Sequence, residues 1–184
     1  MCAKYNRGGM VPESSPPAPV SSMTRYHLTP LKEEHARDIL GWRYPAPYDF
    51  YNPPDERPAE DYVREFIKPE YQFHAVLDGQ NKFSGFCSYG VDGQVTGGNY
   101  SREALDIGLG MKPELTGNGQ GYHFFRSILH YALENFEVDH YRLTVANFNE
   151  RALRLYKNFG FVHHEEFTDC VLNVRYTILM KQLD

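Results

Sequence analysis

The chain has 184 residues, which is the size of one domain or of one domain with a tail. With 41% hydrophobic and 15% aromatic residues its composition is globular rather than disordered, and no apolar run approaches the roughly 18 residues that would span a bilayer. Its net charge of -5 makes it a poor general binder of nucleic acid.

The first 22 residues are rich in proline, glycine and serine and offer few core-forming positions. This composition predicts a flexible N-terminal extension, followed by a single domain over residues 23–184. The extension has no continuous apolar stretch of the kind that a secretory signal needs. Met23 could be an internal start, and the alternative that residues 1–22 are native stays open.

The first half of the domain is expected to contain a strand, two helices and three further strands. In chain order these are strand 25–29, helix 32–40, helix 59–67, and strands 73–77, 83–89 and 104–112. The last of them alternates clearly: Leu105, Ile107 and Leu109 would face one way, whereas Asp106 and the glycines beside it would face the other.

Between the two predicted helices lies an unusual segment, residues 42–54, with four prolines and five aromatic residues. Four prolines exclude a long helix, and five aromatics are uncommon in a solvated loop. Two interpretations are equally supported: these side chains wall a pocket, or they form a hydrophobic lid or dimer contact.

The second half changes to strand and helix in alternation. A glycine-rich loop at 114–121 leads into a helix that runs to about residue 135. A strand at 141–145, a helix at 150–158 and closing strands at 161–168 and 174–182 follow. The helix before residue 135 has apolar positions with a 3.6-residue period, namely Phe124, Phe125, Ile128, Leu129, Ala132, Leu133 and Phe136.

The glycine loop is the first candidate for chemistry. Gly117, Gly119 and Gly121 alternate just before an amphipathic helix, so the backbone can turn tightly and a ligand can approach it closely. The helix start would offer unpaired N–H groups to an anion such as a pyrophosphate. The loop lacks the Gly-Lys-Ser/Thr of a P-loop and the GxGxxG spacing of a dinucleotide site, and a glycine turn without a ligand is the alternative.

The second candidate is the segment NERALRLYKNFGF, residues 149–161. Asn149 suits a helix N-cap, and its side chain could instead reach a ligand. Tyr156 lies at helical spacing with Ala152 and Phe159, so spacing alone favours a core aromatic with its hydroxyl at the rim.

Together the two segments resemble the GNAT superfamily of acyl-CoA N-acyltransferases. The run LGMKPELTGNGQG, residues 109–121, resembles its signature (Arg/Gln)-x-x-Gly-x-(Gly/Ala), with Gly119 and Gly121 at the small positions. Thr116 stands at the Arg/Gln position, which is a departure that removes one side-chain anchor. Residues 149–161 resemble the second signature, Asn-x-x-Ala-x-x-x-Tyr-x-x-x-Gly-Phe, at every quoted position.

The resemblance implies an α/β (α+β) fold: a mixed, mostly antiparallel central sheet with splayed parallel strands in the middle, flanked by about four helices. It also implies that acetyl-CoA binds between the strands at 104–112 and 141–146. The residues expected to contact it are Leu109, Met111, Thr116, Gly117, Asn118, Gly119, Gln120, Gly121 and Asn149.

For the reaction, the resemblance implies direct attack of an amine on acetyl-CoA, with Tyr156 as the acid that protonates the leaving thiolate. Some relatives carry a glutamate base on the strand where this chain has Thr144. Asp106 is our candidate base, acting directly or through water, and a strand-end aspartate that is simply solvated is the alternative.

The acceptor is expected to be an amine of a small molecule or peptide, bound by the aromatic segment. Its candidate contacts are Trp42, Tyr44, Tyr48 and Asp49. We expect no nucleic-acid or membrane partner, and the segment 42–54 and the last strand are candidate contacts of a homodimer. The alternative function is a non-catalytic module that binds acyl-CoA as a sensor or scaffold.

The three cysteines, Cys2, Cys87 and Cys170, are odd in number and far apart, and no pair has the spacing of a zinc site. We therefore expect reduced thiols and a cytoplasmic location. The eight histidines form no zinc-binding pattern, so we expect no metal.

Overall fold

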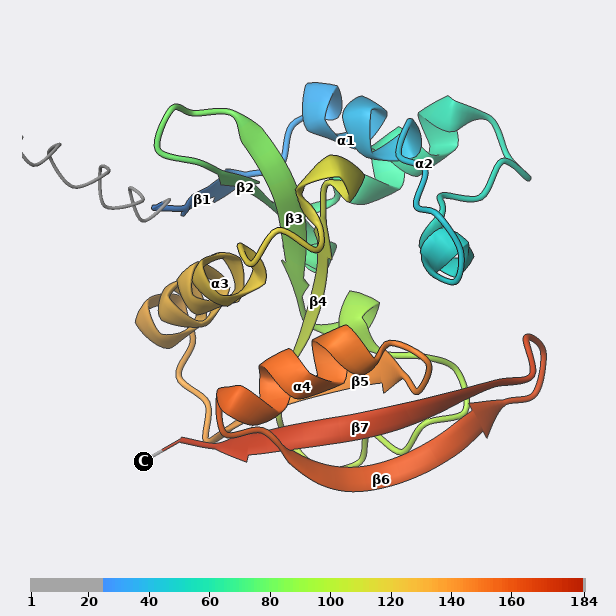
Figure 1. Ribbon diagram of the computed structural model, residues 1–184, viewed down its shortest axis with the longest axis vertical. Helices are drawn as coiled ribbons and strands as arrows, with labels where there is room; N and C mark the ends of the chain where they lie inside the picture. Colours follow the sequence, from blue (N-terminus) through green and yellow to red (C-terminus); the bar gives the residue numbers. More distant parts are fainter. Residues whose placement is uncertain (1–24, 184) are drawn as a thin grey trace, which may run out of the picture.

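A seven-stranded sheet forms the centre of the computed structural model, which describes residues 25–183; the expected extension 1–22 lies outside the described residues. The strands follow the spatial order β1-β2-β3-β4-β5-β7-β6 (Figure 1). Their bounds are β1 His27–Pro30, β2 His74–Leu77, β3 Phe83–Tyr89, β4 Leu105–Met111, β5 His140–Ala146, β6 Val162–Asp169 and β7 Val174–Gln182. The α-helices are α1 Glu33–Leu40, α2 Ala59–Phe66, α3 Gly121–Asn135 and α4 Glu150–Asn158.

The sheet is antiparallel except at its centre, where β4 and β5 run parallel. Their pairing covers only two steps, Leu105 with Tyr141 and Asp106 with Arg142. Beyond Asp106 the two strands separate, whereas β5 stays paired with β7 over its whole length. This confirms the expected mixed sheet with splayed parallel strands in the middle.

The two faces of the sheet are covered by different helices. Cys87 and Tyr89 of β3 join a core cluster with α3, which contributes buried residues such as Phe125 and Ile128. Phe86 points to the other face, where it packs on the cluster of α1 and α2 around Trp42. The alternation of side chains along β3 therefore separates two hydrophobic layers.

The predicted elements agree with the structure to within about two residues at each end, and β3, α4 and β7 agree throughout. Of the apolar positions that keep the helical period of α3, Leu133 does not join the core, because it is 64% exposed. It follows the fully buried Ala132 by one residue, which rotates it about 100° around α3 and away from the buried face of the helix.

Within residues 25–183, no helix has both the length and the apolar character needed to cross a membrane. The same residues contain no group of three or more histidine, cysteine, aspartate or glutamate side chains placed to hold a metal ion. Of the cysteines in this range, Cys87 is buried, Cys170 is exposed and both are unpaired.

Candidate active site

The gap between β4 and β5 is bordered by backbone groups that the sheet does not use. The Gly90 N–H donates to the Asp106 carbonyl, and the Lys112 N–H donates to the Ser84 carbonyl, both at 2.9 Å. Hydrogen bonding alternates along an antiparallel pair, so the even-numbered residues of β4 face β3. Leu109 consequently turns its N–H and carbonyl toward β5, whose pairing with β4 has already ended.

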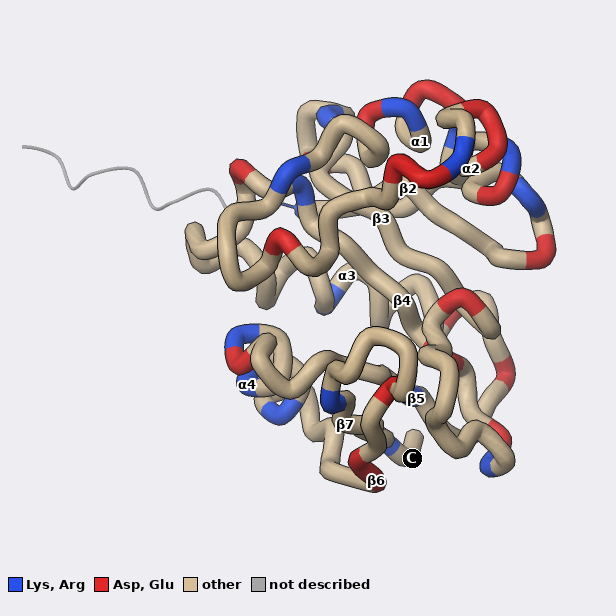
Figure 2. The backbone as a smooth tube through the Cα atoms, turned by 90° about the vertical axis from the view of Figure 1, so that its right-hand side faces the viewer, with Lys and Arg blue, Asp and Glu red and all other residues tan. Residues whose placement is uncertain are grey.

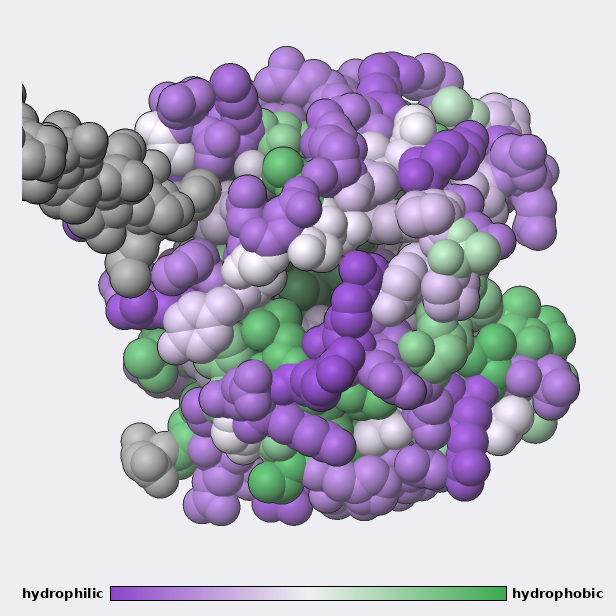
Figure 3. Space-filling model, viewed as in Figure 1, coloured by the Kyte–Doolittle hydropathy of each residue, from purple (hydrophilic) through white to green (hydrophobic). Residues whose placement is uncertain are grey.

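Met111, two residues further on, also turns its carbonyl away from β3. That oxygen accepts a hydrogen bond of 2.8 Å from the hydroxyl of Tyr44, so a residue of the aromatic segment crosses to the end of β4. The surface is hollowed between α3 and α4, with apolar side chains on its floor and hydrophilic ones at its edge (Figure 3). The open strand edge at Leu109 thus lies between two helices that leave room for an extended ligand.

Beside this gap, the glycine loop joins β4 to α3. Gly117 and Gly119 have φ angles of 80° and 75°, which glycine adopts without strain. Nothing lies within 4 Å of the place where a Gly119 side chain would begin. The first N–H groups of α3 have no partner within the helix. The loop and helix start therefore form an open cradle of N–H donors, suited to an anion.

The polar side chains of the loop satisfy themselves locally. Thr116 donates its hydroxyl to the Pro113 carbonyl at 2.8 Å, and Asn118 donates to the Glu114 carbonyl at 3.1 Å. The side-chain oxygen of Gln120 accepts the hydroxyl hydrogen of Tyr26. What the loop offers a ligand is consequently its backbone, with no side-chain anchor from position 116.

Arg151 supplies a positive charge at this point, and the sequence motifs did not single it out. A guanidinium nitrogen lies 3.4 Å from where a Cβ of Gly117 would stand. The guanidinium carbon lies 4.0 Å from the ring centre of Tyr48, and no carboxylate of the described chain pairs with it. Lys and Arg predominate along α4 (Figure 2), where only Glu150 is acidic. The sequence signal for Arg151 is its position in the first turn of the predicted helix at 150–158; only the fold shows that this turn lies opposite the glycine loop.

Tyr156 of α4 is buried, with 7% of its surface exposed, and its ring packs 4.7 Å from that of Phe125. Burial raises the pKa of the Tyr156 hydroxyl, and the nearby Tyr51 adds to the shift, so the hydroxyl keeps its proton at neutral pH. Helical spacing predicts a core aromatic at this position, and the family motif predicts a general acid; the buried, protonated hydroxyl of Tyr156 suits both interpretations.

Asn149 likewise serves two partners. Its side-chain oxygen accepts the Ala152 N–H at 3.2 Å and caps α4, as expected. Its side-chain nitrogen donates to the hydroxyl of Tyr51 at 3.3 Å. Tyr51 belongs to the 3₁₀ helix η1, Tyr48–Tyr51, so the aromatic segment reaches the start of α4 as well as the end of β4.

Asp106 is buried, with 3% of its surface exposed, so the expectation of a solvated strand-end aspartate is wrong. Its two carboxylate oxygens accept hydrogen bonds of 2.6 and 2.7 Å from Arg142. Gln94 donates to one of the same oxygens at 2.8 Å. Arg142 lies directly opposite Asp106 on β5, so both oxygens of the Asp106 carboxylate are already hydrogen-bonded to it. The alternation of residues along the sequence does not reveal this partner.

The proposed acceptor residues separate into three environments. Trp42 is 4% exposed and packs on Phe83 and Phe86, so it belongs to the core rather than to an open pocket wall. Tyr44 is half-buried at the end of β4, and burial raises the pKa of its hydroxyl. Tyr48 lies under Arg151, and Asp49 is exposed in the same turn. The structure thus brings together Tyr44 and Tyr48 around the gap but not Trp42.

Comparison with known proteins agrees with this geometry. Residues 34–161 match the model of the acetyltransferase (GNAT) family. The chain is 28% identical over 159 residues to the acetyltransferase PseH of Campylobacter jejuni, covering 86% of this chain and 93% of that protein.

Solved structures share the fold at lower identity. A GNAT-family acetyltransferase from Bacillus anthracis superimposes with a TM-score of 0.65 at 13% identity, over 86% of this chain and 95% of the other. A chimera of the Vibrio cholerae spermidine N-acetyltransferase SpeG gives 0.67 at 17% identity, over 86% and 95%. AAC(6')-Ib in complex with paromomycin and acetyl-CoA gives a TM-score of 0.67 at 14% identity, over 86% of this chain and 93% of the other.

Proposed function

Because the chain belongs to the GNAT acetyltransferase family, we propose that it transfers the acetyl group of acetyl-CoA directly to an amine of a small molecule or protein. The observation that carries the proposal is the open edge of β4 at Leu109, beside a glycine loop with free N–H donors. A strand edge can hydrogen-bond the amides of an extended ligand arm, and a loop of N–H groups can hold its phosphates.

The residues of the gap fit acetyl-CoA, which supplies an activated acetyl thioester when bound. The backbone of Leu109 would pair with the pantetheine arm, and an N–H there would polarise the thioester carbonyl. Gly117, Gly119 and the N–H groups up to Gly121 would hold the pyrophosphate. Arg151 would provide the cation that Thr116 does not, since guanidinium matches phosphate oxygens well.

Tyr156 is the proposed general acid. A phenol whose pKa is raised by burial is fully protonated at neutral pH, so its proton is present and available to the thiolate as the C–S bond breaks. Asn149, which caps the same helix, would fix the cofactor arm beside it. The arm would then replace Tyr51 as the hydrogen-bond partner of the Asn149 side-chain amide. We do not retain Asp106 as the proposed base, because Arg142 and Gln94 occupy its oxygens.

The test of this proposal is a thiol-release assay with acetyl-CoA over a panel of amines that includes spermidine, an aminoglycoside and lysine peptides. Calorimetric titration of acetyl-CoA into the same protein is the control. Turnover with an amine is the expected result. Binding of acetyl-CoA without turnover on any amine would instead favour a sensor or scaffold, and absence of binding would contradict both functions.

A further inference from the structure

A second feature lies on the opposite face of the sheet from α3 and α4. A cavity of about 270 Å³, here called the α2 cavity, opens between α2, the 3₁₀ helix η2 (Pro69–Tyr71) and the 3₁₀ helix η3 (Val91–Gly93). Aromatic side chains, among them Tyr62, Tyr71 and Phe73, form much of its wall. Its polar lining consists of Arg57, Glu65 and Asp92.

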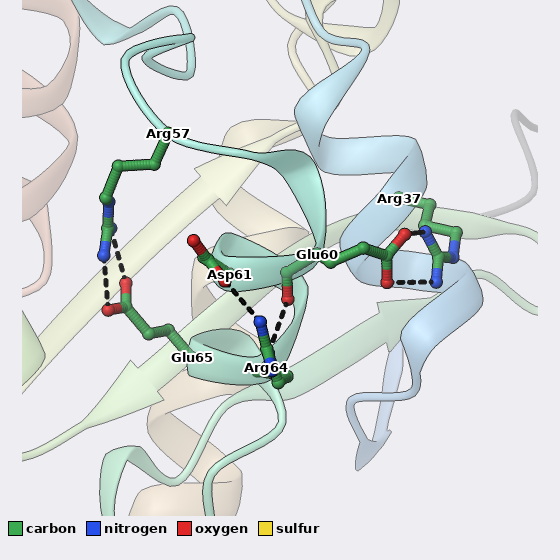
Figure 4. Close-up of polar contacts among 6 residues, drawn as sticks. All are labelled: Arg37, Arg57, Glu60, Asp61, Arg64 and Glu65. Carbon is green, nitrogen blue, oxygen red and sulfur yellow. Dashed lines mark hydrogen bonds and ion pairs between the residues drawn. The ribbon is translucent and has the colours of Figure 1, made fainter.

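The charges of the α2 cavity do not balance. Arg57 and Glu65 neutralise each other through two hydrogen bonds of 2.8 Å, which Figure 4 shows on one side of α2. Asp92 has no cationic partner among the described residues; its hydrogen-bond donor is the neutral hydroxyl of Ser88, at 2.7 Å. The α2 cavity therefore carries one uncompensated carboxylate among aromatic rings, a combination that attracts an organic cation.

Asp92 also reaches the strand that borders the gap. Its carboxylate oxygen lies 3.4 Å from where a Cβ of Gly108 would stand, and Gly108 immediately precedes Leu109. A side chain at position 108 would collide with the Ser88 hydroxyl, at 2.4 Å. Glycine thus keeps the surface of β4 bare between the carboxylate and the backbone that faces the gap.

We propose that the α2 cavity receives a cationic amine acceptor and that Asp92, at its strand end, holds the reacting ammonium and takes its proton. This inference rests on the proposed acetyl transfer and names the class of acceptor and the base for it. Deprotonation is required because an alkyl amine has a pKa near 10 and is almost wholly protonated at neutral pH.

The proton and electron balance is complete without another reactant. The Asp92 carboxylate takes one proton from the ammonium, and the freed nitrogen lone pair forms the C–N bond to the thioester carbonyl carbon. When the carbonyl re-forms, the C–S bond breaks and Tyr156 protonates the thiolate. The second proton lost from nitrogen restores the Tyr156 hydroxyl through solvent, and the proton on Asp92 is released to water. The products are an amide, free thiol and one proton.

The surroundings of Asp92 suit a base. Asp92 is exposed at the rim of the cavity, yet the protein atoms around its carboxyl raise its pKa, and the Ser88 hydrogen bond partly offsets that rise. The titratable groups that face it are Arg57, Tyr62 and Glu65 of the α2 region and Tyr71 of η2. From β3 it meets a hydroxyl and from β4 a glycine, whereas Asp106 of β4 is neutralised by Arg142.

The experiment compares the pH dependence of kcat/KM for the full chain, Asp92→Asn and Ser88→Ala, with the best amine of the panel. Asp139→Asn is the matched control, because Asp139 is exposed and lies outside both sites. We expect Asp92→Asn to lower kcat/KM by about 100-fold, which is the scale of general base catalysis. The fall of kcat/KM on the acidic side of its pH profile (the acidic limb) should disappear in this variant. Ser88→Ala should move that limb to higher pH, because it removes a hydrogen bond that favours the carboxylate.

Calorimetry separates the possible failures. Acetyl-CoA should bind to Asp92→Asn within twofold of the unaltered chain, whereas spermidine, used as a cationic probe with CoA present, should bind more weakly. If Asp92→Asn keeps its acidic limb and its activity within twofold, the assignment of Asp92 is overturned while acetyl transfer stands. If the unaltered chain turns over no amine, acetyl transfer fails, and equal spermidine binding by the two proteins then overturns the cavity as well.

Discussion

Arg142 and Asp106 form a buried, bidentate ion pair. Nε of Arg142 lies 2.6 Å from one carboxylate oxygen of Asp106, and a terminal guanidinium nitrogen lies 2.7 Å from the other. They are also the last residues paired between β4 and β5 before the strands separate. A further nitrogen of Arg142 donates to the Arg102 carbonyl at 2.8 Å, and Gln94 donates to Asp106. The pair thus fastens the β3–β4 loop to the point where the gap begins.

Replacing one partner should therefore be costly. Arg142→Met leaves the Asp106 carboxylate buried without its cation, and we expect the free energy of unfolding to fall by about 3–5 kcal/mol. Urea denaturation at neutral pH measures this loss. The double variant Arg142→Met with Asp106→Leu is the control, since an apolar pair of similar volume should recover most of the stability. A single-variant loss below about 1 kcal/mol would contradict a tightly coupled pair.

The same pair predicts the phenotype of Asp106→Asn. An amide at this position loses the ionic attraction to Arg142, so stability should fall, yet the acidic limb of the kcat/KM profile should stay at the same pH. The measurement is that profile at a temperature where the variant is folded by circular dichroism. Disappearance of the limb would return the role of base to Asp106.

The sequence was sufficient where the signal is local. Alternation located β4, helical periodicity located α3 and α4, and the spacing of the two motifs pointed to the glycine loop and to Tyr156. It was insufficient where a side chain depends on a partner from a distant strand. Trp42 packs on Phe86 in the core because β3 lies under α1, and no local pattern reports that.

The same limit explains why the sequence points to Asp106 as a base and does not point to Arg151 as a phosphate contact. The partner of Asp106 is 36 residues away in the chain, and Arg151 meets Gly117 only when α4 lies beside the loop before α3. Charges in a sequence can be counted, but which of them neutralise one another is decided by the pairing of elements. Asp92 is the converse case, a carboxylate that the fold leaves without a cation.

Tyr156→Phe tests the proposed acid. The substitution removes one hydroxyl from a buried ring and keeps its packing on Phe125, so the fold should persist. We expect kcat to fall by about 100-fold or more, the usual scale for general acid catalysis, with acetyl-CoA affinity nearly unchanged. Steady-state thiol release and calorimetry give the two numbers. Tyr51→Phe is the control for a hydroxyl in the same cluster, and an unchanged kcat in Tyr156→Phe would remove Tyr156 from the mechanism.

Arg151→Ala tests the proposed phosphate contact. Arg151 is exposed, so solvent weakens its attraction for an anion, and we expect acetyl-CoA affinity to fall by only about fivefold to tenfold, most at low ionic strength. Arg154→Ala, which removes an equal charge from the same helix, should change the affinity by less than twofold. S-acetylpantetheine lacks phosphates and should bind both variants alike. A uniform loss for both ligands would mean that Arg151 supports the loop rather than the phosphates.

His74 makes stability depend on pH in a predictable direction. Its Nδ1 lies 2.8 Å from the Gln72 carbonyl, which can only accept, so Nδ1 carries the hydrogen and Nε2 accepts from the Tyr131 hydroxyl at 2.8 Å. Burial lowers the pKa of His74 in the folded chain, and the Gln72 contact only partly offsets it. As the pH falls below about 6.5, the unfolded chain gains its proton first, so the free energy of unfolding decreases, by at most about 1.4 kcal/mol per pH unit for one group.

Urea titrations between pH 8 and about 5 should show a smaller decrease for His74→Gln, whereas His130→Gln, on the exposed side of α3, should follow the unaltered chain. Parallel curves for His74→Gln and the unaltered chain would show that another group controls the acid sensitivity.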